Sequence, residues 1–78
     1  MNDVREEALQ MLADMGETPR LGGLISEAAA ARLLSYKPEY FRQKAAEGMS
    51  PVPWKLHGNR RFYRLANIIE YLSEDDGI

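Results

Sequence analysis

The stretch SPVPWKLHGNRRFYRL, residues 50–65, constrains the fold of this chain more than any other. Its two prolines lack the backbone N–H that a helix needs, and they therefore exclude a helix across this region. Residues that favour β-strands then flank a Gly-Asn pair, which is typical of a two-residue hairpin turn. We therefore expect an antiparallel hairpin with strands near 54–57 and 60–63.

The register of this hairpin depends on the length of its turn. A two-residue turn pairs Trp54 with Tyr63. It also places the charged Arg61 opposite Leu56, which is an unfavourable partner for an apolar side chain. An odd-length loop would instead bring Phe62 opposite Leu56 or Trp54, and the sequence alone leaves both registers open.

Helical patterns occupy the chain before the hairpin. The first runs from residue 4 to the glycine at 16, with Asp3 placed to cap its start. A linker, ETPRLGG, separates it from a short extended entry at Leu24-Ile25. The second helix is expected to begin after an N-cap at Ser26 and to end at Leu34.

Two further helices complete the expected fold. After the three residues SYK, Pro38 suits the first position of a helix that Gly48 ends. On that helix Phe41 is expected to face inward, with Ala45 and the ring of Pro38 on the same buried side. A last helix follows the hairpin over 65–72. Four residues of the hairpin and this helix are expected in the core: Trp54, Leu56, Ile68 and Leu72.

The formal net charge of −2 hides an uneven distribution of charge. Residues 1–34 carry six acids and three bases, whereas residues 35–64 carry seven bases and two acids. Residues 65–78 carry four acids and no base. Because a polyanion docks on a local patch, the middle third is the expected nucleic-acid surface despite the acidic average.

The composition excludes several other classes of protein. The chain has no cysteine and one histidine, so disulfide frameworks and Cys/His zinc sites are excluded, and a reducing cytoplasm is the expected location. The charged N-terminus and the lack of a long apolar run predict a protein that is neither secreted nor embedded in a membrane. We expect no cofactor, no metal and no small-molecule substrate.

The quoted segments also resemble a known family. LISEAAAARLLSYKPEYFRQKAAEGMSPVPWKL and GNRRFYRLANIIEYL are similar to the small winged helix-turn-helix proteins of the excisionase and AlpA type, relatives of the MerR DNA-binding domain. The resemblance implies an α+β, mostly helical winged helix-turn-helix with a two-stranded hairpin wing. It covers residues 24–72, which leaves an N-terminal helix and linker over 1–23 and an acidic tail over 73–78.

The resemblance implies a surface made of the second helix of the motif and the wing. If that helix enters the major groove, Gln43 suits adenine, Glu39 suits cytosine, and Arg42 suits guanine or a phosphate. Tyr40 is expected either in the groove or in the core. The candidate DNA-binding residues are Lys37, Glu39, Tyr40, Arg42, Gln43 and Lys44 on the helix, and Lys55, His57, Asn59, Arg60, Arg61 and Arg64 on the wing, with Arg60 and Arg61 projecting at its tip.

As the resemblance implies, the chain is expected to be an excisionase of a bacteriophage or integrative element that bends double-stranded DNA, helps an integrase and cuts no strand. Alternatives with the same fold are a phage-type transcriptional regulator and the DNA-binding part of a terminase small subunit. A protein–protein docking module is an alternative of another class. An enzyme finds little support, because the lone histidine has no nucleophile near it and no phosphate loop occurs. Arginines on a hairpin can also simply protect a sheet edge from aggregation.

Overall fold

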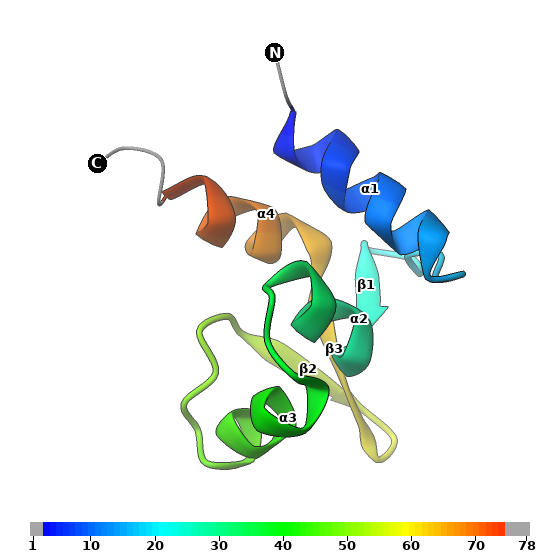
Figure 1. Cartoon of the computed structure of the whole chain (residues 1–78). Helices are drawn as coiled ribbons and strands as arrows, with labels where there is room; N and C mark the ends of the chain where they lie inside the picture. Colours follow the sequence, from blue (N-terminus) through cyan, green and yellow to red (C-terminus); the bar gives the residue numbers. More distant parts are fainter. Residues whose placement is uncertain (1–2, 75–78) are drawn as a thin grey trace.

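The computed structural model describes residues 3–74, which form a small α+β fold of four helices and one three-stranded antiparallel sheet (Figure 1). This confirms the expected mixed α+β class. In chain order the elements are α1 (Val4–Asp14), β1 (Leu24–Ser26), α2 (Glu27–Leu33), α3 (Pro38–Ala46), β2 (Trp54–His57), β3 (Arg60–Arg64) and α4 (Leu65–Glu74). The last helix extends two residues into the predicted tail, and residues 75–78 lie outside the described residues.

The helices begin where the sequence predicts. The Asp3 carboxylate accepts a hydrogen bond of 3.0 Å from the Arg5 N–H at the start of α1. The Ser26 hydroxyl accepts one of 3.2 Å from the Ala29 N–H at the start of α2. Pro38 occupies the first turn of α3, where Lys37 makes no side-chain capping bond. After α3, Gly48 has a φ of 78°, the left-handed conformation that ends many helices.

The sheet has one more strand than the expected two-stranded wing. Leu24–Ser26 pairs antiparallel with β3, so that the strand order is β1-β3-β2 and β3 lies in the centre. Burial explains this difference, because Ile25 lies opposite Tyr63 and both side chains are fully buried. The extended segment before α2 therefore pairs with the otherwise open edge of β3 and adds a large apolar contact.

The two-residue turn is confirmed. Trp54 pairs with Tyr63, Leu56 pairs with Arg61, and His57 and Arg60 flank the turn. Gly58 has a φ of 66°, and Asn59 is not among the non-glycine residues with positive φ. A glycine with positive φ at the first central position is the pattern of a type II′ hairpin turn.

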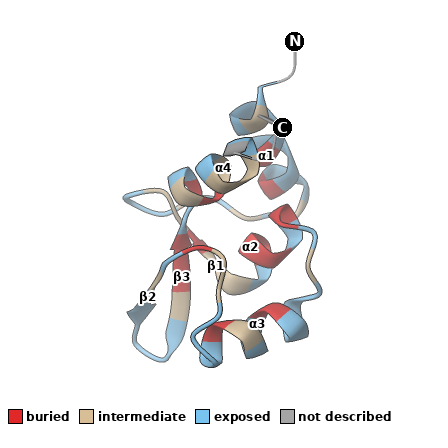
Figure 2. Ribbon diagram, turned by 90° about the vertical axis from the view of Figure 1, so that its left-hand side faces the viewer, coloured by how far each residue is buried: buried red, intermediate tan, exposed pale blue. Residues whose placement is uncertain are grey.

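The core corrects two of the burial expectations (Figure 2). Ile68, Phe41 and Ala45 are buried as expected, and Trp54 and Leu72 are partly buried against the core.

Leu56, however, is 60% exposed, because it lies near the hairpin turn opposite Arg61 instead of an apolar partner. Pro38 is exposed as well. The ring of Tyr36 stacks on Phe41 with 5.6 Å between centroids, and it covers Phe41 in place of the proline.

α2, which carries three buried alanines, lies in the middle of the molecule (Figure 2). The small alanine side chains let α1, α3 and α4 pack closely against α2. α1 contributes Ala8 and Leu12 to the same core cluster, so the N-terminal helix is a core layer of this fold. α1 and α4 lie toward one end of the molecule, and α3 and the hairpin turn lie at the other (Figure 1).

Candidate nucleic-acid interface

The candidate residues of α3 are mostly exposed. Glu39, Tyr40, Arg42 and Gln43 are all exposed, and Tyr40 retains 50% of its surface, so it is not a core residue. Lys37, just before the helix, is exposed too. The helix therefore exposes four polar or aromatic side chains along its first two turns, two before and two after the buried Phe41.

Gln43 and Lys44 of α3 share a partner that the sequence did not single out, Glu47. The Gln43 Nε2 donates to Glu47 Oε2 at 3.2 Å, and the Lys44 Nζ lies 3.9 Å from Glu47 Oε1. The Lys44 ammonium also lies 5.3 Å from the ring centroid of Tyr40. Exposed contacts of this kind contribute little to stability, so they leave Gln43 free to exchange its partner for a ligand.

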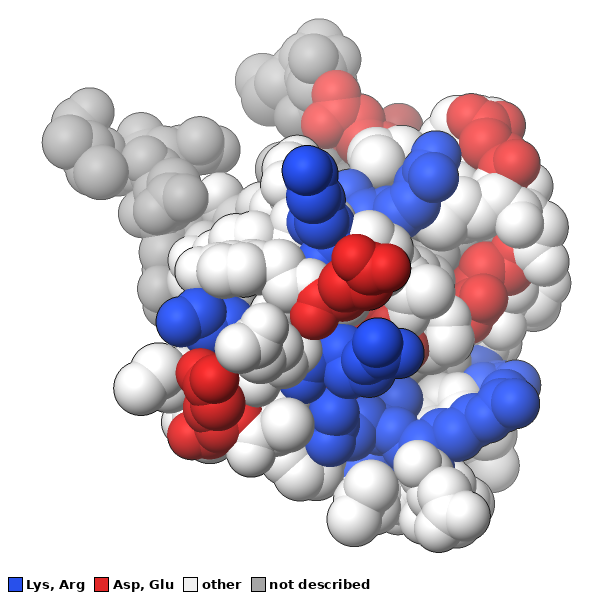
Figure 3. Space-filling view, turned by 60° about the horizontal axis from the view of Figure 1, so that its bottom comes forward, with Lys and Arg blue, Asp and Glu red and all other residues white. Residues whose placement is uncertain are grey.

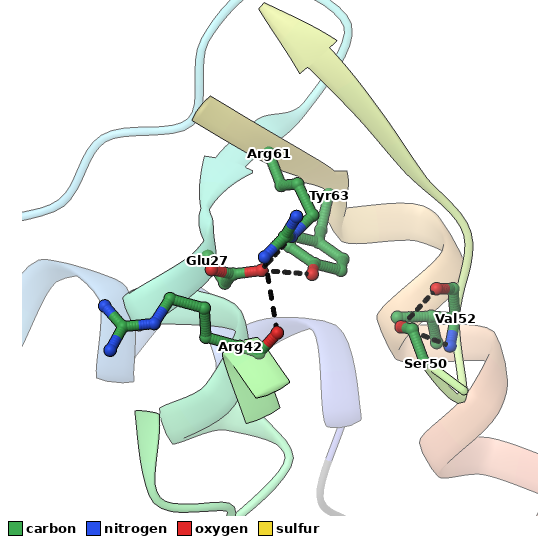
Figure 4. A network of polar contacts seen from close by, with 6 residues as sticks. All are labelled: Glu27, Arg42, Ser50, Val52, Arg61 and Tyr63. Carbon is green, nitrogen blue, oxygen red and sulfur yellow. Dashed lines mark hydrogen bonds and ion pairs between the residues drawn. The ribbon is translucent and has the colours of Figure 1, made fainter. Parts of the chain in front are cut away.

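Arg61 does not project from the hairpin as expected. Its Nε donates to Glu27 Oε2 at 2.7 Å, and its Nη2 donates to the Arg42 carbonyl at 3.3 Å (Figure 4). The Arg61 side chain is 19% exposed, and its guanidinium carbon lies 5.2 Å from the Trp54 ring centroid. The reason is the hairpin register, which directs Arg61 to the same face of the sheet as Tyr63 and toward α2 and α3.

Glu27 joins α2 to the hairpin at this point. Its Oε2 also accepts a hydrogen bond of 2.7 Å from the Tyr63 hydroxyl (Figure 4). The hydrogen bond to Glu27 raises the pKa of the Arg61 guanidinium above its usual value. The pKa of the Tyr63 hydroxyl is raised as well, mainly by burial and secondly by the hydrogen bond to Glu27. The first residue of α2 thus holds the hairpin against α2, and Arg61 in turn bonds the hairpin to α3. No local pattern in the sequence indicated this role for Glu27.

The remaining basic residues of the hairpin are exposed on the other face of the sheet. Strand alternation directs Lys55, His57, Arg60 and Arg64 to the face opposite Arg61, although Arg60, which adjoins the turn, also lines a cleft with Arg61. Asn59 is exposed in the turn. The His57 ring meets Phe62 edge-on, with 5.9 Å between centroids. The hairpin therefore has one internal arginine and four exposed basic or imidazole side chains.

A cleft lies between the linker, the start of α2, α3 and the hairpin turn. It has a volume of about 560 Å³. Its charged and polar lining brings together four predicted site residues, Arg42, Asn59, Arg60 and Arg61, with Arg20, Glu17, Ser26 and Glu27. Arg20 was not predicted: it stands in the acidic third of the chain, and nothing in the linker pattern pointed to its position.

The other candidates lie outside this cleft. Tyr40 and Lys44 line a smaller hollow with Tyr36 and Met49, and His57 lines another with Arg20 and Arg60. Lys55 and Arg64 line a small one at the base of the hairpin. Seen from the end that carries α3 and the hairpin turn, Lys and Arg atoms form one continuous group from the centre to the lower right, and further Lys and Arg groups lie above it and to its left, with carboxylates among them (Figure 3).

The described residues contain no cluster of three or more His, Asp or Glu side chains that could hold a metal ion. Among the helices of residues 3–74, none has the length and apolar character needed to cross a membrane. Comparison with protein-family models, with curated proteins and with solved structures found no match to this chain. The resemblance to excisionases therefore stays a prediction from the sequence.

Proposed function

We propose that the chain is a sequence-specific duplex-DNA-binding protein in which α2, α3 and the hairpin act as a winged helix-turn-helix. The observation that carries this proposal is the cleft where exposed α3 meets the hairpin turn, lined by four arginines and two glutamates. Both glutamates already have internal partners, so the cationic side chains dominate what a ligand meets. Phosphate groups of a duplex are the ligand that such a surface favours.

In this proposal α3 lies in the major groove and the hairpin lies on the flanking backbone. Gln43 and Glu39 read base edges, because both are exposed on the outer side of α3. Arg42 lines the cleft beside the hairpin and contacts a phosphate. The exposed hairpin residues Lys55, Arg60 and Arg64 extend the phosphate contacts away from α3.

The proposed role is that of an excisionase in the cytoplasm of a host cell, which bends DNA and directs an integrase without catalysing a reaction itself. The support for it is the sequence resemblance over 24–72. One small domain covers only a short site, so this role requires several copies side by side on DNA and a monomer or weak dimer in solution. A transcriptional regulator and the DNA-binding part of a terminase use the same surface on a different target.

Salt-dependent DNA binding tests the proposal. The five exposed bases are Lys37 at the N-cap of α3, Arg42 on α3, and Lys55, Arg60 and Arg64 on the hairpin. If each neutralises one phosphate, affinity should fall about 500-fold between 50 and 200 mM salt. A gel-shift titration of 30-base-pair duplexes over that range measures the slope. Absence of duplex binding at 50 mM salt would refute the proposal and would favour a protein docking module.

A circular-permutation assay on attachment and promoter DNA then separates the roles. Cooperative occupancy of tandem sites with a bend supports the excisionase. Bending a site of 20–30 base pairs by 40–90° costs about 1–6 kcal/mol, which contacts between neighbouring copies would have to offset. A stable dimer on one unbent palindrome would support a repressor instead.

A further inference from the structure

The linker before β1 places one unpredicted cation, Arg20, beside the proposed DNA surface. We infer that Arg20 is a phosphate contact for duplex DNA, so that the surface extends beyond α3 and the hairpin into the segment that the sequence indicated to be a plain linker. This inference rests on the proposed function. It is carried by three features of Arg20: its fixed backbone, the packing of its guanidinium and the charges that surround it.

The backbone of Arg20 is fixed by a tight turn. Its N–H donates to the Leu24 carbonyl at 2.8 Å, and its own carbonyl accepts from the Gly23 N–H at 2.8 Å. Gly22 and Gly23 have φ values of 84° and 74°, the left-handed conformation that glycine adopts at low cost. Because Leu24 begins β1, the turn holds Arg20 at the edge of the sheet.

The side chain of Arg20 is held as well. Its guanidinium carbon lies 4.5 Å from the centroid of the Phe62 ring, and Phe62 is only 8% exposed. Stacking on a ring uses the flat face of a guanidinium and leaves its N–H groups free to donate at the edge. Within residues 3–74, Arg20 forms no ion pair, so its charge is available to a ligand.

The surroundings of Arg20 favour an anion. It lines the cleft together with Arg42 from α3 and Arg60 from the hairpin. The nearby carboxylate of Glu17 accepts from the Ser26 N–H at 3.0 Å and from its hydroxyl at 3.3 Å.

Glu27 is similarly occupied by Arg61 and Tyr63. Four arginines against two glutamates leave the lining of the cleft with a net charge of +2. Two carboxylates that are already bonded do not compete for the three arginines from the linker, α3 and the hairpin.

The geometry points to the sugar-phosphate backbone as the ligand. The cleft lies between α3 and the hairpin, so a duplex that contacts both elements passes its backbone over this opening. A guanidinium that is already ordered loses little conformational freedom on binding a phosphate. Arg20 therefore contributes to affinity for every sequence, because a phosphate carries no base identity.

Three variants test the inference. Arg20→Gln removes the charge and keeps a polar, though shorter, side chain. Arg20→Lys keeps the charge. Arg32→Gln is the matched control, because Arg32 is an exposed arginine of α2 that does not line the cleft. Each is compared with the wild type by gel shift on two 30-base-pair duplexes of unrelated sequence from 50 to 200 mM salt, after thermal unfolding has shown an unchanged midpoint.

The size of the affinity loss follows from the release of one counterion per phosphate contact. Arg20→Gln should lower affinity about 15-fold at 50 mM salt and about fourfold at 200 mM, which reduces the salt slope by about 0.9. The loss should be equal on both duplexes. Arg20→Lys should keep the wild-type slope, and Arg32→Gln should change neither affinity nor slope.

Two results overturn the inference while leaving the proposed function intact. The first is wild-type affinity and slope in Arg20→Gln. The second is a lower affinity with an unchanged slope, which would give Arg20 a structural role through Phe62. If the wild-type chain binds neither duplex, the proposed function fails, and the inference fails with it.

Discussion

Replacing Glu27 by glutamine should destabilise the fold, because this one carboxylate joins α2 to the hairpin. Its Oε2 accepts two hydrogen bonds of 2.7 Å, one from Arg61 and one from Tyr63. The Glu27 and Arg61 side chains are 18% and 19% exposed, so solvent replaces the lost contact only in part. Glutamine keeps one acceptor oxygen for Tyr63, but it removes the charge that faces the guanidinium.

The magnitude follows from the bond that is lost. A hydrogen bond between charged groups contributes about 1.5–3 kcal/mol, and a partly buried guanidinium without its counter-charge adds a desolvation cost. We therefore expect Glu27→Gln to lower the free energy of unfolding by about 2 kcal/mol. For a domain of this size that corresponds to a fall of about 8–16 °C in the unfolding midpoint.

Thermal unfolding followed by circular dichroism measures this change. The fluorescence of Trp54, the single tryptophan, provides a local probe because Arg61 lies against its ring. Glu39→Gln is the control, since Glu39 is an exposed glutamate on α3 without an ion pair among the described residues. The double variant Glu27→Gln/Arg61→Met should lose less than the sum of the single losses. A loss below about 0.5 kcal/mol for Glu27→Gln would refute the reasoning.

Three further predictions concern DNA binding and pH. Gln43→Ala should weaken discrimination at one base pair by about 1–3 kcal/mol, as measured by binding to single-base variants of the site. Arg60→Ala should weaken binding to all sequences alike and lower the salt slope by about one. Burial raises the pKa of the Tyr63 hydroxyl, so the folded state holds this proton more tightly than the unfolded state, and stability should fall as pH rises above about 10. Urea unfolding from pH 7 to 11 should show a smaller alkaline fall in Tyr63→Phe.

Each of these predictions has an outcome that contradicts it. Equal loss of specificity in Gln43→Ala and Arg60→Ala would argue against separate base and phosphate contacts. An alkaline fall of the same size in Tyr63→Phe would show that other groups cause it. Arg61→Met is informative for the surface as a whole: an internal Arg61 leaves the salt slope unchanged, whereas a reduced slope would mean that this arginine reaches the DNA.

Local chemistry made the helix starts and the hairpin predictable. An N-cap at Ser26, a proline at the start of α3 and a Gly-Asn turn each act within a few residues of themselves, and each occurs in the structure as expected. The extended entry at Leu24-Ile25 was predicted, but its pairing with β3 was not, because three residues are too few to show a pattern of alternation. The pairing forms only because β3, some 40 positions later in the chain, offers an edge and a buried tyrosine to Ile25.

The candidate site shows the same limit for side chains. The exposure of Arg42 and Gln43 follows from helical spacing relative to Phe41, which is a local property. The position of the Arg61 side chain depends instead on its bond to Glu27, which precedes it by 34 positions. Arg20 reaches the site through its contact with Phe62, again far along the chain. Spacing predicts which way a side chain points, but it does not identify the partner that it meets.

Internal pairing determines which charges of the basic middle third remain for a ligand. Arg61 is bonded to Glu27 and Lys44 lies against Glu47, whereas Lys37, Arg42, Lys55, Arg60 and Arg64 are exposed and form no ion pair within residues 3–74. Arg20 joins the exposed set from outside that third. Of the two arginines predicted to project at the tip, Arg61 thus bonds the hairpin to α2 and α3, whereas Arg60 stays exposed with the other bases. In the proposed mode of binding, a duplex on α3 therefore meets a hairpin that Arg61 already holds against that helix.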